Sequence, residues 1–268
     1  MTLPKPDIRA KRVKVAHCSM RFGISDSKKK ADFDTLFGRG YDWITGTEAG
    51  PGAGNSQKIM KAAARKWGYH LVVSSKYGTW VAVRKTLVTA GSFRKTESHA
   101  LDNSTKLKTP GKFGAKGVVG ATFNTGKTFG KISVGAVHYT NTTGSGGKAK
   151  KKAFDTKYAK VLRAWRNRRV KYGSLVFMGG DMNRNDKTND VFMGQGGFIT
   201  CWDEMEHYPH TSEGKHGTID VIARMTGTNR VKCVKARHWN DNGIFMNTDH
   251  YIIEAIYDIM PVGYRSKK

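Results

Sequence analysis

Acidic and histidine side chains stand at the ends of several short apolar segments of this chain. Glu48, His138 and Asp181 each close one such segment, and Asp220 and His250 lie in or beside two others. A carboxylate can activate water or bind a hard cation, and a histidine can move a proton near neutral pH. Strand ends at one edge of a sheet core bring such groups together, so these residues are candidates for one catalytic site. Taken singly, each is more often a cap, a turn residue or a core histidine.

The segments that must position these residues alternate between strand and helix patterns. Apolar residues at three- and four-residue spacing indicate helices after Ser25-Asp26, after Asn55-Ser56 and after the Gly-rich loop 142–147, and the first two pairs can cap their helices. The polar, basic segment 95–116 is expected to be a surface loop. Short β-branched or aromatic segments indicate strands at 13–18, 41–48, 69–73, 79–83, 86–93, 118–123, 132–138, 175–178, 218–223, 231–236 and 250–256.

Lysine and arginine far outnumber the acidic residues. The 268 residues include 47 Lys and Arg against 21 Asp and Glu, a formal net charge of +26, while 38% of the chain is hydrophobic. That hydrophobic fraction supports a sizeable core and excludes a disordered chain. The charge is spread along the chain. This distribution favours a polyanionic partner that covers a broad face of the protein, and it argues against a membrane surface as the partner. The helix after 147 carries further basic residues in its later half, which fit a solvated face as well as a nucleic-acid contact: Arg163, Arg166, Arg168, Arg169 and Lys171.

The chain shows no sign of secretion or of a membrane span. Its three widely spaced cysteines exclude a disulfide scaffold and a Cys-x-x-Cys zinc site, and they indicate a reducing compartment. No signal-peptide pattern and no apolar run of about 18 residues is present. We expect an intracellular, cytoplasmic protein with a basic arm at 1–12, a single domain at 13–260 and a basic tail at 261–268.

Six motifs along the chain occur in the order of a known superfamily. They are 15–23, 42–48, 135–141, Gly180-Asp181-Met182-Asn183, Thr218-Ile219-Asp220 and Asn247-Thr248-Asp249-His250. Their order, from Val13 to Tyr257, resembles the endonuclease/exonuclease/phosphatase superfamily, which includes deoxyribonuclease I and apurinic endonucleases. The resemblance implies an α/β fold, a four-layer α/β/β/α sandwich of two mixed sheets packed face to face with helices outside. It also implies hydrolysis of a phosphodiester or phosphomonoester with a divalent cation.

The resemblance implies that Glu48 binds the cation, with Asp249 as a second contact. A hard cation held by oxygen ligands neutralises the phosphate charge that repels a nucleophile. We expect Mg²⁺, with Mn²⁺ as a substitute. The family has Asn as a metal contact in its first strand, where this chain has Cys18-Ser19. Because serine is shorter than asparagine, we expect Ser19 to reach the cation only through a water.

The remaining motif residues are expected to act on the phosphate and the attacking water. His250 can move a proton, and the resemblance places Asp220 beside it to fix its tautomer and stabilise its charge. Asp181 is expected to orient or activate the water. Hydrogen bonds to phosphate oxygens are expected from Asn183, Asn141 and His138.

The basic loops indicate that the substrate is nucleic acid. Lys148, Lys150, Lys151 and Lys152 follow the Gly-rich loop and are expected to contact its phosphates. The Trp-Cys-Asp-Arg segment of the inositol phosphatases and the apolar hairpins of sphingomyelinases are missing, which argues against inositol phosphates and lipids. We therefore expect a metal-dependent nuclease that acts on DNA rather than RNA. It should have little sequence specificity, since no recognition-helix or zinc-finger module is present.

Two further departures from the family pattern leave other functions open. No acidic residue stands at Gly78-Thr79, where members like deoxyribonuclease I orient the first histidine, and no Arg follows Glu48. A catalytically weakened nucleic-acid-binding protein on the same fold is therefore one alternative. A phosphatase that acts on another phosphate ester is the other.

Overall fold

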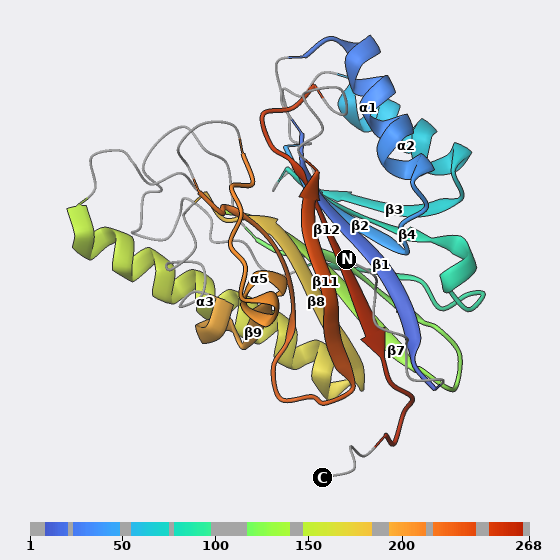
Figure 1. Ribbon diagram of the computed structural model, residues 1–268, viewed down its shortest axis with the longest axis vertical. Helices are drawn as coiled ribbons and strands as arrows, with labels where there is room; N and C mark the ends of the chain where they lie inside the picture. Colours follow the sequence, from blue (N-terminus) through green and yellow to red (C-terminus); the bar gives the residue numbers. More distant parts are fainter. Residues whose placement is uncertain are drawn as a thin grey trace.

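Two six-stranded β-sheets pack face to face (Figure 1). This computed structural model describes residues 9–20, 24–48, 55–74, 78–97, 117–139, 147–183, 193–212, 217–239 and 247–264, with the backbone alone for 147–154.

The first sheet contains both ends of the described chain. It consists of β1 (Lys11–Ser19), β2 (Trp43–Thr47), β3 (Tyr69–Ser74), β4 (Thr79–Arg84), β11 (Val231–Trp239) and β12 (Ile252–Ile259). Their order across the sheet is β11-β12-β1-β2-β4-β3. β1 and β2 are parallel and the other neighbouring pairs are antiparallel, so the sheet is mixed.

The second sheet is built from the middle of the chain. It consists of β5 (Arg94–Glu97), β6 (Val119–Asn124), β7 (Lys131–His138), β8 (Ser174–Asp181), β9 (Phe198–Thr200) and β10 (Asp220–Met225). The order is β5-β6-β7-β8-β10-β9, with β7 and β8 parallel and the other pairs antiparallel.

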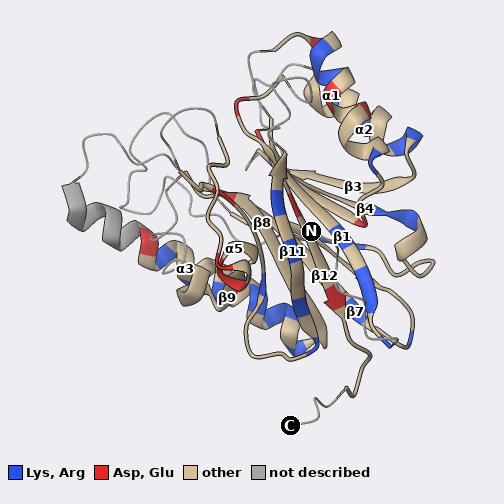
Figure 2. Cartoon of the chain, in the orientation of Figure 1, with Lys and Arg blue, Asp and Glu red and all other residues tan. Residues whose placement is uncertain are grey.

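Helices cover the outer faces of both sheets. On the first sheet, α1 (Asp26–Gly38) and α2 (Ser56–Lys66) lie side by side (Figure 1), and Phe33 of α1 meets Trp80 of β4 with ring centroids 6.1 Å apart. On the second sheet, α3 (Gly147–Lys171) is the long outer helix, and α5 (Cys201–Met205) is a short turn after β9. Lys and Arg are spread over strands and helices alike (Figure 2). The expected four-layer α/β/β/α sandwich is confirmed.

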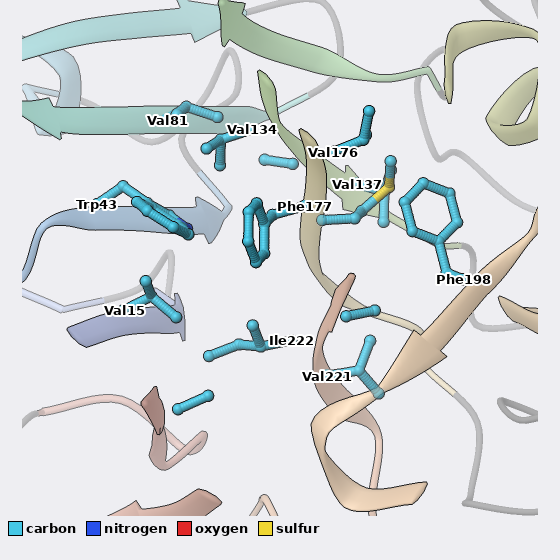
Figure 3. Close-up of a cluster of buried hydrophobic side chains, with 14 of the residues drawn as sticks. Val15, Trp43, Val81, Val134, Val137, Val176, Phe177, Phe198, Val221 and Ile222 are labelled. Carbon is cyan, nitrogen blue, oxygen red and sulfur yellow. The ribbon is translucent and has the colours of Figure 1, made fainter. Parts of the chain in front are cut away.

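Large apolar side chains fill the space between the sheets. Trp43 of β2 packs on Phe177 of β8 with ring centroids 4.8 Å apart, and Val15 and Ile222 lie in the same cluster (Figure 3). Burial of such side chains contributes about 1.5 to 3 kcal/mol each, so this layer fixes how the two sheets are placed on one another. No helix in the described part of the chain has the length and hydrophobicity needed to cross a membrane.

The predicted strand at 86–93 is wrong. Lys85–Leu87 form a single 3₁₀ turn, and the strand starts later, at Arg94 of β5, and runs into the segment 95–116 that was expected to be a loop. Leu87 is buried in the core and Gly91 has a positive φ of 70°, so the chain turns where β-branched residues suggested an extended segment. The cap at Ser25 is confirmed, since its Oγ accepts from Lys28 N. Asn55 occupies the N-cap of α2, but its side chain donates to Asp26 instead of capping.

Strand directions bring several strand ends to one end of the sandwich. Within the first sheet, β1 and β2 run parallel and end together, with Ser19 beside Thr47. Within the second, β7 and β8 also end together, with His138 beside Asp181. β10 is antiparallel to β8, so its first residue, Asp220, lies opposite Asp181. This edge holds the motif residues that the structure describes, whereas Asn141 lies outside the described residues.

Candidate active site

A pair of side chains, Asp220 and His250, forms the centre of the site. His250 Nδ1 lies 2.8 Å from Asp220 Oδ2, with 13% of the His250 side chain and 0% of the Asp220 side chain exposed. Burial disfavours the charged form of His250 and by itself would lower its pKa. The charge and hydrogen bond of Asp220 outweigh this effect, and the charge of Asp181 adds to them, so the pKa of His250 is raised. Burial also opposes ionisation of Asp220, yet His250 lowers its pKa. The pair is therefore ionic at neutral pH, with its imidazole on the solvent side.

A second histidine, His17, faces the other oxygen of the same carboxylate. His17 is fully buried, and its Nε2 lies 3.4 Å from Asp220 Oδ1. Its Nδ1 lies 3.0 Å from Thr45 Oγ1. Among the described residues neither Nε2 of His17 nor Oδ1 of Asp220 has a hydrogen-bond partner, so their 3.4 Å separation is a polar contact longer than a hydrogen bond. Gly179 makes room for the contact between His17 and Thr45, because a Cβ at this position would collide with Thr45 Oγ1 and lie 3.3 Å from His17 Nδ1.

Thr211 holds the backbone of the central pair. Its Oγ1 accepts hydrogen bonds from the backbone N–H groups of Ile219 and Asp220, each at 2.9 Å. Its carbonyl accepts from Tyr251 N at 2.8 Å, one residue after His250. One buried threonine thereby fixes the two segments that carry the carboxylate and the imidazole.

Asp181 lies beside the two partly exposed histidines of the site, His138 and His250. Its Oδ2 is 3.5 Å from His138 Nε2 and 3.9 Å from His250 Nε2. Burial first, and then the charge of Asp220, raise the pKa of Asp181 to about 7, with Glu48 adding to the effect. A carboxyl group that titrates near neutral pH can take a proton from water under working conditions.

Asn183 is placed by its neighbours in a left-handed conformation, with a φ of 50°. Its backbone N donates to Asp181 Oδ1 at 2.8 Å, and its Nδ2 donates to Tyr139 O at 2.9 Å. Tyr139 follows His138, and its hydroxyl donates to Asp155 of α3. An amide carries two hydrogens, so one remains on Asn183 for a phosphate oxygen.

Glu48 stands directly after β2, also with a positive φ, of 60°. This conformation is uncommon for a residue with a side chain, and here it turns the chain at the strand end. The half-buried carboxylate contributes to the raised pKa of Asp181, which places its charge within reach of the same centre.

Ser19 is fully buried beneath this edge. Its Oγ accepts a hydrogen bond from Thr47 Oγ1 at 2.6 Å, and its carbonyl accepts from Thr248 Oγ1 at 2.6 Å. These contacts connect the ends of β1 and β2 to the loop before His250. The expectation that Ser19 reaches a cation through a water stays a prediction.

Asp32 of α1 anchors the loop that carries Asp249. The two carboxylate oxygens of Asp32 accept from the backbone N and from Nδ2 of Asn247, each at 2.9 Å. Asp32 is buried, with 1% of its surface exposed, and burial raises its pKa despite these bonds. Asp249 itself is half-buried, and its charge helps to raise the pKa of His250.

The donors at this edge fit a hard divalent cation. Asp181, Asp220 and His250 each offer an atom, and these atoms lie within 4.8 Å of one another. Asp220 and His250 are already bonded to each other, and Asp181 lies beside His250, so the carboxylate of Glu48 is the better ligand. The raised pKa of Asp181 reflects burial near other carboxylates, a cost that a cation would relieve.

Several expected substrate contacts lie outside what the structure describes. Asn141 falls in the gap at 140–146. Only the helical backbone is described for Lys148, Lys150, Lys151 and Lys152, at the start of α3. Their contacts with phosphate stay predictions.

The sequence analysis did not select His17 or Asp32. A signal for His17 was present, because Val13, Val15 and His17 alternate along β1 and therefore point to the same, inner face. A histidine in that series points between the sheets, toward the strand ends with the motif residues. Asp32 gave no comparable signal, since a helix surface often carries an aspartate.

The comparisons with known proteins find similar structures but no similar sequence. No family model and no curated protein matches this chain in sequence. An endonuclease/exonuclease/phosphatase family protein from Bacteroides thetaiotaomicron has a TM-score of 0.69 at 12% identity, covering 97% of this chain and 99% of that one. ANGEL2, a 2',3'-cyclic phosphatase solved with adenosine-2',3'-vanadate, has a TM-score of 0.69 at 11% identity, with 96% and 99% covered. TDP2 from D. rerio, solved with a single-strand DNA product, has a TM-score of 0.62 at 15% identity, with 92% and 98% covered.

These neighbours share one architecture over nearly their whole length. The chain therefore has the endonuclease/exonuclease/phosphatase fold that the motif order implied. At such low identities the likeness concerns the fold, and the chemistry must be argued from the site itself.

Proposed function

We propose that this chain is a divalent-metal-dependent phosphoester hydrolase, and specifically a nuclease that cleaves DNA rather than RNA with little sequence specificity. The observation that carries the proposal is the contact of the ionic pair Asp220–His250 with the buried Asp181, whose pKa is raised to about 7. This arrangement places a buried base, Asp181, within 4 Å of the positively charged imidazole of His250, which is partly exposed.

In the proposed reaction Asp181 takes a proton from the attacking water. The water oxygen bonds to phosphorus as the bond to the leaving oxygen breaks on the opposite side, and the leaving oxygen takes a proton from solvent water. His250 Nε2 lies 3.9 Å from Asp181, on the side of the attacking water, so it donates to a non-bridging phosphate oxygen and not to the leaving oxygen. Asp220 keeps the ring oriented and charged, and Asn183 and His138 donate further hydrogen bonds to the phosphate. When bound, a cation held by Glu48 would neutralise the phosphate charge.

The preference for nucleic acid rests on charge. A net charge of +26 suits a polymer that carries one negative charge per roughly 1.7 Å of duplex. Two structural neighbours are compatible with this class, since TDP2 was solved with a single-strand DNA product and ANGEL2 with an adenosine-2',3'-vanadate. Another neighbour is a mannosyl-6-phosphatase, so the fold also accepts a phosphomonoester.

One observation favours a second candidate, a nucleic-acid-binding protein with weakened catalysis. Ser19 replaces the family's metal-contacting Asn, and its oxygen is already engaged by Thr47 at 2.6 Å. Weak metal binding would leave the basic surface intact while reducing cleavage.

The test is cleavage of a supercoiled plasmid, a single-stranded DNA, an RNA and p-nitrophenyl phosphate, each with Mg²⁺ and with EDTA. The variant Asp181→Asn should lose at least about 100-fold in rate, the size expected for a lost general base. The matched control is Asp258→Asn at the far end of β12, which removes a carboxylate paired with Arg12 and should leave the rate unchanged.

Each outcome selects one function. Metal-dependent DNA cleavage that Asp181→Asn abolishes supports the nuclease. Faster cleavage of RNA than of DNA would overturn the substrate preference. Hydrolysis of p-nitrophenyl phosphate alone would make the protein a phosphatase, and DNA binding without hydrolysis under any divalent ion would favour the binding protein.

A further inference from the structure

The long helix α3 has one side buried against the second sheet. Tyr158, Leu162 and Trp165 on this side are fully or almost fully buried. They make α3 part of the fold, since each lies in the main hydrophobic cluster. Among the described side chains of α3, Val170 is the only large apolar one that is exposed, whereas a helix that binds a lipid surface needs a whole apolar face.

The opposite side of α3 is a stripe of four exposed cations. At 100° per residue, these side chains fall within an arc of about 80° and extend over about 21 Å of helix. They are Lys157, Lys160, Arg168 and Lys171, and we call them the α3 stripe. Ala164 lies in the middle of the arc, so no large side chain interrupts it. Figure 2 shows the basic residues along this helix in blue.

Two other arginines of α3, Arg163 and Arg166, have structural partners. Arg163 Nε donates to Gln195 O at 2.8 Å, and Arg166 Nη1 donates to Gly197 O at 2.9 Å, which fixes the turn before β9. Asp155 is the only acidic residue of α3 and accepts from Tyr139. Within the described part of the chain, no Asp or Glu forms an ion pair with a residue of the α3 stripe. These four charges therefore serve neither the fold nor a neighbouring acid there.

The α3 stripe begins near the candidate active site. Asp155 contacts Tyr139, whose carbonyl accepts from Asn183, and Lys157 follows Asp155 by two residues. From there the helix runs along the outside of the second sheet to the start of β8, at the other end of the sandwich (Figure 1). A polymer with one end in the site can follow this line.

We propose that the α3 stripe binds the phosphate backbone of a nucleic acid outside the bond that is cleaved. Phosphates of one strand follow one another by about 3.4 Å of duplex axis, so about 21 Å of stripe spans roughly six of them. The inference rests on the proposed nuclease function and adds to it a preference for long substrates. In this proposal the α3 stripe contributes to the affinity for nucleic acid and takes no part in the cleavage reaction.

The experiment compares two variants that lose the same charge. One replaces Lys157, Lys160, Arg168 and Lys171 by Gln, and the control replaces four exposed cations of the helices on the first sheet, Lys30, Lys58, Lys61 and Arg65, by Gln. Gln has a helix propensity close to that of Lys and Arg, so both variants should fold. Dissociation constants are measured for 8- and 40-base-pair duplexes in Ca²⁺ over a series of salt concentrations. Turnover is measured with bis(p-nitrophenyl) phosphate and Mg²⁺.

The stripe variant should bind the 40-base-pair duplex at least tenfold more weakly and lower the salt slope by about 3 to 4, because four phosphate contacts are lost. The control should change both quantities much less, and turnover of bis(p-nitrophenyl) phosphate should be unchanged in both variants. Equal losses in the two variants, or unchanged binding in the stripe variant, would overturn the inference while leaving the nuclease intact. Binding of polyglutamate, a model of an acidic protein, is measured for the same variants. If the stripe variant lost polyglutamate binding but retained duplex binding, the inference would be overturned in favour of an acidic protein partner. A wild type that hydrolyses neither DNA nor bis(p-nitrophenyl) phosphate would instead refute the proposed function.

Discussion

Replacing His17 by Gln and by Asn separates the two contacts of its buried ring. His17 Nε2 faces Asp220 Oδ1 at 3.4 Å, and Nδ1 lies 3.0 Å from Thr45 Oγ1. The amide nitrogen of Gln reaches about as far as Nε2, whereas that of Asn reaches only as far as Nδ1. His17→Gln should therefore keep a donor on the carboxylate, and His17→Asn should keep only the contact with Thr45.

The expected magnitude follows from the buried charge of Asp220. Removing the polar group that faces a buried acceptor costs about 1 to 3 kcal/mol, which corresponds to about 5- to 150-fold in rate if the orientation of His250 depends on it. We expect His17→Asn to lower kcat by that factor and His17→Gln to stay within about threefold of the wild type. His17 is fully buried and cannot touch a substrate, so KM should change little in either variant.

The measurement is kcat and KM for plasmid cleavage together with the melting temperature of each variant. If His17 serves only packing, activity should follow melting temperature and the two variants should not separate. A Gln variant as slow as the Asn variant would refute the positioning role, as would a change confined to KM. Thr45→Val is a second probe should His17→Asn not fold. It removes the partner of Nδ1, together with a long hydrogen bond to Ala16 O, and should cost less than His17→Asn.

Four further predictions concern the same site. Glu48→Gln should lower Mg²⁺-supported cleavage at least about 100-fold while the melting temperature stays within a few degrees, and unchanged activity would remove Glu48 from the site. Asp220→Ala and His250→Ala should each cost at least about 100-fold, with the double variant little worse than the worse single one, whereas multiplied losses would show that they act separately. Burial lowers the pKa of His250, but Asp220 outweighs it and raises the value to about 10, so the folded state holds this proton more tightly than the unfolded one. The protonated His250 therefore contributes fully to the free energy of unfolding below about pH 6.5, and this contribution is lost as pH rises toward about 10. Urea unfolding of the metal-free protein at a series of pH values should show this decline in the wild type and a weaker dependence on pH in Asp220→Asn. Asp32→Ala frees both groups of Asn247 and should lower kcat about tenfold through the loop before His250, while Asp32→Asn, which keeps one acceptor, should lose less, as rates and melting curves of both variants would show.

Motifs at strand ends made much of the site predictable from sequence. Asp181, Asp220 and His250 each belong to a short segment whose residue types suit one chemistry, and sheet topology then brings these strand ends together. The family resemblance carried by the order of the motifs also implied the four-layer sandwich, which the structure confirms. His17 was missed because its neighbours in β1 are buried apolar residues, and a histidine among them is more often part of the core.

Local patterns failed where tertiary contacts decide the conformation. The strand predicted at 86–93 contains several β-branched residues, but burial of Leu87 and the turn at Gly91 override that preference. The helix α5 was not predicted, although Thr200 and Asp203 form a capping box with the spacing that marks a helix start. It lasts only five residues, too few for a hydrophobic period to be seen.

Backbone geometry at Glu48 and Asn183 sets stability against activity. Both residues have a positive φ, 60° and 50°, and the described residues include only one other non-glycine in that region, Glu206. A left-handed conformation costs a residue with a Cβ about 1 kcal/mol or more, and asparagine somewhat less, whereas glycine adopts it freely. A library of this protein selected for thermal resistance alone should therefore accumulate glycine at positions 48 and 183. The same library selected for cleavage should retain the original residues, so the two selections would diverge at these positions.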